Sequence, residues 1–474
     1  MAVRFPLRRL LPALFLAGTV LRAHAADAPA YSPPIAQPGP SVPGAHVFGN
    51  TPSPYAGLPD QPVRGEPSDG LWERPVLLGV PPLRHDMAEE GFSINPVYTG
   101  EVFGNVSGGA GGYDGRGRAV MYDHLLNVPL DVDLHRLVPA WQGATFHVNV
   151  LWIAGPGLSP AYLGDLGNVS SIQGYNTVRL QELWFQQAFW GERASVRFGQ
   201  LATDSEFMIS DTANLFLNGT FGEFNLAATN LATPYDANNY PIAAPGVRFL
   251  VQPIPAFYFM SGLYNGSSES QTLNPYGTDF PVDGHDGLAL YSEVGYVVNP
   301  DQGLKGSYKL GSFVHTHDWN DWGSREAAAL GTGTLRSEGA DFGLYAIADH
   351  ELWKKDGRVL SGFTRLGYAP PDVNIVDWYL DAGLDLTGFM PGRTNDVVGI
   401  AMAWSSISRS YGAYQQAVNG TPSYGAETVL EATYKVTITP WWNVQPDFQY
   451  IWTPGGQSGA PNAAVIGVRT QIAF

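Results

Sequence analysis

Apolar and polar positions alternate with a period of two over most of this chain. The pattern is clearest at the end, where Ile466, Val468, Ile472 and Phe474 alternate with small or polar residues such as Arg469. A period of two places successive side chains on opposite faces of a β-strand. We predict about sixteen such strands, near 97–106, 120–135, 143–154, 176–189, 193–201, 244–252, 255–266, 286–298, 304–316, 338–352, 357–369, 374–388, 395–406, 427–438, 441–452 and 463–474.

The length of these segments favours a membrane barrel over a soluble sandwich, whose strands also alternate. They run to about 10–12 residues, as a tilted transmembrane strand requires, whereas soluble strands average about half that. Trp442 and Trp452 lie at the two ends of one segment, where an interfacial aromatic girdle would fall. The opposite faces carry ionised groups so regularly that the enclosed space should be wet. The sequence therefore predicts an all-β fold, a transmembrane antiparallel β-barrel, occupying residues 83–474 and wide enough for an aqueous channel.

The links between the predicted strands alternate in length. Short links read as periplasmic turns, and the long links 155–175, 267–285, 317–337 and 407–426 read as extracellular loops. The longest unassigned stretch is 202–243, and a connection of that length is usually functional. Phe221–Ala227 is a candidate for a short strand within it. Alternatively, the whole stretch folds inward and narrows the pore.

The N-terminal region has the organisation of an exported protein. Residues 1–25 read as a secretory signal peptide, with Arg4, Arg8 and Arg9 before an apolar run and Ala23-His24-Ala25 as the cleavage site. Residues 26–82 are rich in proline and read as a poorly ordered periplasmic segment or a spacer that reaches the cell wall. Leu83–Gly91 reads as a short helix stopped by its glycine.

Composition excludes several kinds of chemistry. There is no cysteine, so disulfides, zinc-thiolate sites and cysteine nucleophiles are impossible. The formal net charge of −17 argues against a nucleic-acid partner. No nucleophile elbow, P-loop or clear zinc motif is visible, so we expect no enzymatic activity, no metal and no cofactor. Acids on the predicted strands are compatible with calcium binding, but a hydrated lumen wall is the simpler interpretation: Asp377, Asp381, Asp385, Glu427 and Glu431.

Several ordered blocks of sequence resemble the carbohydrate-selective porins of the OprB type. The best match runs from Arg179 to Phe207 (RLQELWFQQAFWGERASVRFGQLATDSEF), and it continues in FLNGTFG at Phe216–Gly222. Gly91–Gly109 and Val132–Val148 also match, so that the resemblance covers about residues 80–474. It implies passive diffusion of mono- and small oligosaccharides across the bacterial outer membrane. It further implies outer-membrane lipid, lipopolysaccharide and the insertion machinery as partners, and a monomer or a homotrimer.

A sugar-selective constriction needs hydrogen-bonding groups beside an aromatic face, because a sugar presents hydroxyls in the ring plane and apolar C–H faces. The inward face of the best-matching block offers such groups: Arg179, Glu182, Trp184, Gln186, Arg197, Asp204 and Glu206. The alternation breaks near Gln181–Glu182, which predicts a β-bulge. An equally weighted interpretation is that these residues form ion pairs that brace the wall. A general or cation-preferring porin is the alternative function, and an outer-membrane enzyme is a more distant one.

Overall fold

The computed structural model describes residues 87–109, 118–235, 238, 240–269, 271–282, 287–299 and 303–474. Every described residue belongs to one compact unit of the chain. The predicted signal peptide and proline-rich segment lie outside the described residues. None of the described helices is long and apolar enough to cross a membrane.

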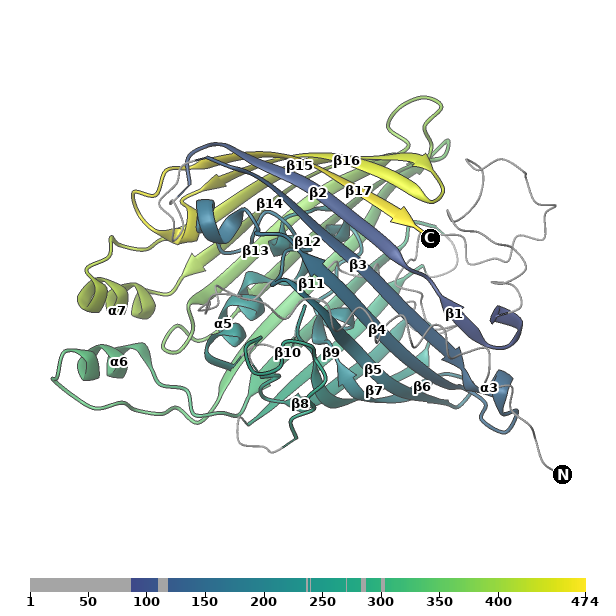
Figure 1. The fold of residues 1–474 in the computed structure, drawn as a ribbon, viewed down its shortest axis with the longest axis horizontal. Coiled ribbons are helices and arrows are strands. Elements are labelled where there is room, and N and C mark those ends of the chain that lie inside the picture. Colours follow the sequence, from purple (N-terminus) through teal and green to yellow (C-terminus); the bar gives the residue numbers. More distant parts are fainter. Residues whose placement is uncertain are drawn as a thin grey trace. The chain divides into compact units, whose positions relative to one another are not determined.

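Sixteen antiparallel strands close into a barrel (Figure 1), which confirms the predicted fold class and strand positions. The closure joins β17 to β2, with Ile472 opposite Tyr98. A seventeenth strand, β1 (Phe92–Ile94), pairs with β3. The barrel strands are β2 (Val97–Ser107), β3 (Val120–Asp133), β4 (Ala144–Ala154), β5 (Thr177–Phe189), β6 (Ala194–Leu201), β7 (Ala244–Ile254), β8 (Phe257–Asn265), β9 (Leu288–Val298), β10 (Gly306–His315), β11 (Asp341–Lys355), β12 (Arg358–Tyr368), β13 (Val376–Thr387), β14 (Val397–Ile407), β15 (Ala426–Thr439), β16 (Trp442–Trp452) and β17 (Ala463–Ala473).

The alternating pattern sorts side chains as predicted. Ile466 and Val468 are exposed on the outer face of β17. Arg469, the next residue along the strand, is buried on the inner face. Trp442 and Trp452 point outward at opposite ends of β16. The short turns lie at the same end as Phe474, which is the periplasmic end in barrels of this kind.

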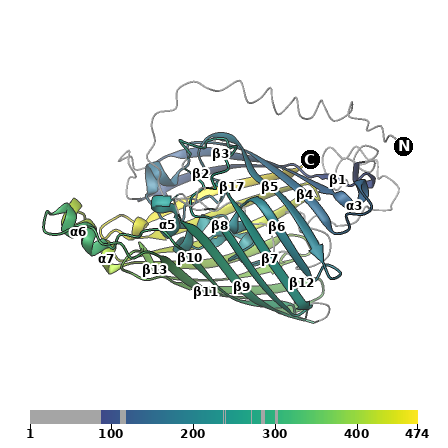
Figure 2. The ribbon, with the colours of Figure 1, turned by 90° about the horizontal axis from the view of Figure 1, so that it is seen from below.

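Helices occur in the connections. Within the described residues they are α3 (Leu134–Leu137), α4 (Gly219–Gly222), α5 (Asn225–Tyr235), α6 (Trp322–Ala329) and α7 (Arg409–Asn419), with the short turns η2 (Ser159–Leu163), η3 (Thr203–Ser205), η4 (Ala213–Leu215) and η5 (Pro454–Gly456). In both views α6 and α7 lie side by side beyond the strand ends (Figures 1 and 2), and the rings of Trp322 and Tyr411 are 4.9 Å apart. The predicted helix at 83–91 is seen only in part. Residues 87–89 are helical, Gly91 takes φ +92°, and 83–86 lie outside the described residues.

The described residues between 202 and 243 fold into the barrel, which confirms the inward alternative for this stretch. Phe221–Ala227 is not a strand, because it contributes to α4 and α5. The side-chain amide oxygen of Asn218 accepts a hydrogen bond from the Thr220 N–H (3.0 Å) and starts the helical turn. We call residues 202–243 the inserted loop.

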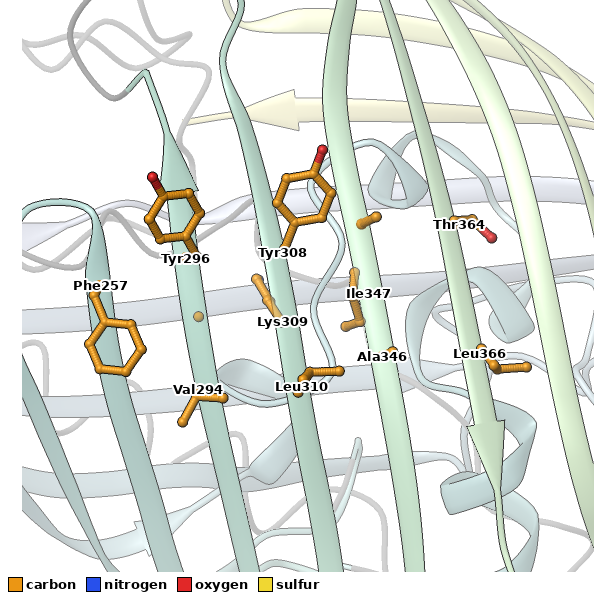
Figure 3. Close-up of a pocket in the computed structure, with 12 residues that line it drawn as sticks. Phe257, Val294, Tyr296, Tyr308, Lys309, Leu310, Ala346, Ile347, Thr364 and Leu366 are labelled. Carbon is orange, nitrogen blue, oxygen red and sulfur yellow. The ribbon is translucent and has the colours of Figure 1, made fainter.

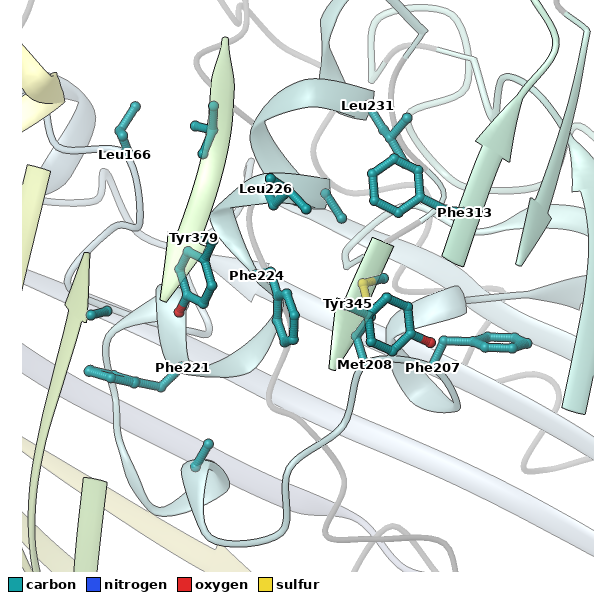
Figure 4. Close-up of a cluster of buried hydrophobic side chains, with 14 of the residues drawn as sticks. Leu166, Phe207, Met208, Phe221, Phe224, Leu226, Leu231, Phe313, Tyr345 and Tyr379 are labelled. Atoms are coloured by element: carbon teal, nitrogen blue, oxygen red, sulfur yellow. The ribbon is translucent and has the colours of Figure 1, made fainter. Parts of the chain in front are cut away.

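The inserted loop builds an apolar core inside the barrel (Figure 4). Phe207, Phe221 and Phe224 are almost completely buried, against wall residues such as Tyr345 and Tyr379. The expectation of a wholly wet interior is therefore wrong for this part of the lumen. Much of the space between the wall strands is filled by protein.

The link 155–175 joins β4 to β5 at the end opposite Phe474, as expected of an extracellular loop, and it also folds inward. Its Leu166 N–H donates to the Glu427 carboxylate (2.9 Å), and its Val169 carbonyl accepts from Gln449 (2.9 Å). Both partners lie on the inner wall. Two long connections thus share the lumen, and the remaining passage must run beside them.

Candidate constriction site

A bulge on β5 turns the candidate side chains toward the lumen, as the sequence predicts. Asn149 on β4 lies opposite Glu182, whereas its neighbour Val150 lies opposite Leu180. Gln181 is therefore the extra residue. After the bulge Glu182 and Trp184 face inward, and both are more than nine-tenths buried.

An ion-paired cluster joins the wall to the inserted loop. Glu206 of the loop lies 3.2 Å from Arg197 Nη1 on β6 and 2.6 Å from Arg248 Nη2 on β7. Arg248 also donates to Gln186 Oε1 (3.0 Å) and to Ser195 (2.7 Å). Because Arg197 and Arg248 lie directly opposite each other on adjacent strands, their like charges would repel without the carboxylate between them.

Trp184 supplies the aromatic face of this cluster. The Arg197 guanidinium lies 3.8 Å from the centre of its ring, within cation–π range. The His147 ring stacks on Trp184 at 4.5 Å, and His147 Nδ1 lies 2.7 Å from Asp131. A continuous chain of polar and aromatic contacts thus runs from β3 to β7, and we call it the arginine–tryptophan cluster: Asp131, His147, Trp184, Gln186, Arg197, Glu206 and Arg248.

The other candidates lie outside this cluster. Glu182 accepts a hydrogen bond from the Ala202 N–H (3.3 Å) at the start of the inserted loop. Asp204 accepts one from the Tyr240 N–H (3.2 Å) near the end of the loop. Arg179 is 1 % exposed and donates to the Tyr175 hydroxyl, away from Glu206. The structure therefore brings together three of the six main candidates, Trp184, Arg197 and Glu206.

Carboxylates of the wall hold the inserted loop by its backbone. Glu431 accepts hydrogen bonds from the N–H groups of Leu217 (2.5 Å) and Asn218 (2.9 Å). Asp349 accepts one from the Thr212 N–H (3.1 Å), and Glu293 one from the Met208 N–H (3.3 Å). The same kind of contact links Glu427 to the 155–175 connection. These hydrogen bonds fasten the loop in place, because each one satisfies a backbone N–H group that is buried away from water.

A buried ion pair of the wall also holds the inserted loop. Arg365 and Asp381 are both 0 % exposed, with Arg365 Nη2 2.5 Å from the carboxylate. Arg365 also donates to the carbonyls of Thr220 (2.9 Å) and Gly222 (2.8 Å). For Asp381, Glu427 and Glu431, both earlier interpretations are therefore corrected. These acids are neither a hydrated wall nor free to bind calcium, because each is buried against protein donors.

Two features of the cluster escaped the sequence reasoning. Arg248 lies between the outward-facing Val247 and Phe249, so the period-two rule already places it in the lumen. Asp131 and His147 lie in a matching block but carry no local signal that links them to Trp184. Their pairing arises from register, because His147 lies opposite both Asp131 on β3 and Trp184 on β5.

Comparison with known proteins places this barrel in a family. The model of the family described as "Carbohydrate-selective porin, OprB family" matches residues 117–474. The chain belongs to this family. Porin B of Pseudomonas aeruginosa is 26 % identical over 421 residues, which cover 82 % of this chain and 89 % of that protein. The putative porin QuiX of Acinetobacter baylyi is 22 % identical over 385 residues, covering 74 % and 82 %.

A solved structure supports the fold of this OprB-family porin. The high-pH structure of Pseudomonas putida OprB superposes with a TM-score of 0.74 and 22 % identity, covering 83 % of this chain and 96 % of that one. Family and fold together make the chain a carbohydrate-selective porin of the outer membrane.

Proposed function

We propose that mono- and small oligosaccharides pass the inserted loop beside the arginine–tryptophan cluster, and that this cluster sets the selectivity. The observation that supports the proposal is the arrangement of Arg197, which stacks on an indole ring while its side chain stays partly exposed. Its side chain is 12 % exposed, against 3 % for Arg248. A sugar can therefore meet a charged donor and an aromatic surface at the same point.

In the passage a sugar exchanges hydrogen bonds to water for hydrogen bonds to the protein. A sugar that enters the narrow passage gives up water, and each hydrogen bond to a charged group returns about 1.5–3 kcal/mol. Such contacts must remain few, because a channel has to release its permeant as readily as it admits it. One partly exposed arginine side chain, with Gln186 beside it, meets this requirement better than a deep binding pocket.

Glu206 has a second role, because it forms ion pairs that brace the barrel wall. Its ion pairs with Arg197 and Arg248 attach the inserted loop to β6 and β7. We therefore assign Glu206 a positioning role and Arg197 a direct contact with the sugar. Glu182, Asp204 and Arg179 are proposed to act only through the placement of the neighbouring loops.

Ion current through single channels in planar bilayers tests this assignment when glucose is added. We expect Arg197→Ala to weaken glucose block, whereas Arg197→Lys keeps the charge and restores only part of it, because the planar stacking is lost. Glu206→Ala should raise the conductance as well as weaken the block, because the loop loses its tether. Arg193→Ala, on the exposed β5–β6 turn, is the matched control. Unchanged glucose block in both Arg197→Ala and Glu206→Ala would place the constriction elsewhere.

A general or cation-preferring porin is the second candidate, favoured by the net charge of −17. Cation preference would require acids of the wall that face the passage. At least four wall acids instead accept hydrogen bonds from backbone N–H groups of the inward connections. Reversal potentials in a KCl gradient, with liposome swelling in sugars of increasing size, separate the two candidates. Strong cation selectivity without sugar preference favours the general porin.

We also propose the arrangement of the whole chain. Residues 1–25 direct export and are removed after Ala25, 26–82 form a periplasmic segment, and 83–474 form the porin domain, which acts by diffusion without catalysis or cofactor. N-terminal sequencing of the mature protein tests the cleavage site. Outer-membrane lipid, lipopolysaccharide and the insertion machinery are the expected partners. The mass of the detergent-solubilised protein decides between monomer and homotrimer.

A further inference from the structure

The outer face of the barrel is hollowed between β8 and β15, with β10–β13 at the centre. Small side chains lie opposite one another there: Ala348 pairs with Thr364, which pairs in turn with Ala382. Two hollows of about 420 and 560 Å³ meet at Ala348 and Thr364. Tyr308 and Leu310 border the first hollow (Figure 3).

A basic group lies at the periplasmic end of the same strands. Lys355 and Arg358 face each other at the tip of the β11–β12 hairpin, and both are exposed. Two cations directly opposite each other repel, and no ion pair to either is found in the described part of the chain. On two other periplasmic turns the arginine is ion-paired, Arg393 with Asp396 at 2.5 Å and Arg136 with Asp133 at 3.8 Å. Even with Asp356 in the hairpin tip, this corner of a strongly acidic protein is positive.

The spacing of the basic group and the hollow matches one membrane leaflet. Six residues separate Arg358 from Thr364, which is about 20 Å along a strand. A strand tilt of about 40° turns this into a depth of about 15 Å, half the thickness of the hydrocarbon core. In Figure 3 the hydroxyls of Tyr296 and Tyr308 point toward the end where β9 terminates, as interfacial tyrosines do.

We propose that this face holds an anionic phospholipid of the periplasmic leaflet. Its acyl chains fill the two hollows, and its phosphate contacts Lys355 and Arg358, whose charges are otherwise uncompensated. Arginine and lysine both recognise phosphate, and basic clusters at a membrane surface attract anionic lipids. The proposal requires the barrel to lie in the membrane and is independent of sugar selectivity.

Native mass spectrometry of the detergent-solubilised protein, with phosphatidylglycerol and phosphatidylethanolamine as probes, tests the site. The wild-type protein should retain phosphatidylglycerol preferentially. K355Q/R358Q should lower that preference roughly tenfold or more. A348L/T364L, which fills the hollows, should lower retention of both lipids. R193Q/A464L, with changes to the rim at the β5–β6 turn and to β17, is the control, and heat-modifiable gel migration confirms that each variant is folded.

Three results overturn the proposal. The first is equal retention of the two lipids by the wild type. The second is an unchanged preference in K355Q/R358Q. The third is a change of oligomeric mass in A348L/T364L, since that places a second copy of the chain on this face instead of a lipid.

Discussion

Replacing Arg365 by methionine tests whether buried charge holds the inserted loop in the lumen. The guanidinium joins Asp381 of the wall to the Thr220 and Gly222 carbonyls of the loop, and it lies 4.6 Å from the Phe224 ring centre. Methionine retains much of the packing volume but removes every one of these polar contacts. Asp381 is then left buried with the Tyr379 hydroxyl (2.7 Å) as its remaining side-chain partner.

The expected free-energy cost is large compared with the stability of loop insertion, but not compared with the stability of the barrel. Removing one partner of a buried ion pair costs about 3–5 kcal/mol. A loss of that size lowers the ratio of inserted to released loop by more than about a hundredfold. The wall itself is held by a continuous closed ladder of backbone hydrogen bonds, so we expect the loop to leave while the barrel stays folded.

Single-channel recordings should therefore show a larger and noisier conductance for Arg365→Met, and limited proteolysis should cut the inserted loop. Arg358→Met, an exposed arginine on the same strand, is the control and should behave as the wild type. Adding Asp381→Leu should recover part of the loss, because a neutral pair carries no uncompensated charge. A wild-type conductance with a protected loop in Arg365→Met would refute the reasoning.

Three further outcomes are expected. Glu431→Leu should also raise conductance, since it removes the acceptor of two loop N–H groups, and the same recordings check it. Gly399→Val should displace the loop, because a Cβ there would lie 2.6 Å from Leu215 Cδ2, at a cost of about 1–3 kcal/mol; Gly425→Ala, with open space around it, is the control, and unchanged conductance in Gly399→Val would contradict the packing argument. Asp321 caps α6: partial burial opposes its ionisation, but the Ser324 N–H and hydroxyl and Arg336 outweigh it and hold its pKa below the usual range. Its stabilisation is therefore complete above the ordinary aspartate pKa and is lost as the pH falls through the lowered one; hydrogen exchange of α6 should report this, with about 1 kcal/mol lost in Asp321→Ala at neutral pH.

The strands were predictable because their signal is local. A period of two needs only the neighbouring residues, and it placed even the bulge at Gln181 and the inward face of Trp184. The same rule would have placed Arg248. It does not reveal which inward-facing groups meet, because Arg197 and Glu206 come together only once the inserted loop turns back onto the wall.

The inserted loop was harder to predict because its partners are distant in sequence. Leu217 and Glu431 are 214 residues apart, and the side chains of Asn218 and Gln449 are bonded across 231 residues. Phe221–Ala227 also contains apolar residues that suggest a strand in isolation. The Asn218 side chain decides otherwise by capping a helical turn, a signal that lies just before this segment in the sequence.

The acids of the wall explain why charge counting misleads here. Acidic groups on the inner faces suggested a wet, cation-attracting lumen. Backbone N–H groups, however, can satisfy the hydrogen-bonding capacity of a carboxylate as well as water can. In this barrel the inserted loop supplies those N–H groups and brings an apolar core with it. The acids therefore position the loop, and we propose that the loop narrows the passage at Arg197. Selectivity should follow from the few side chains that remain accessible there, whatever the net charge of the chain.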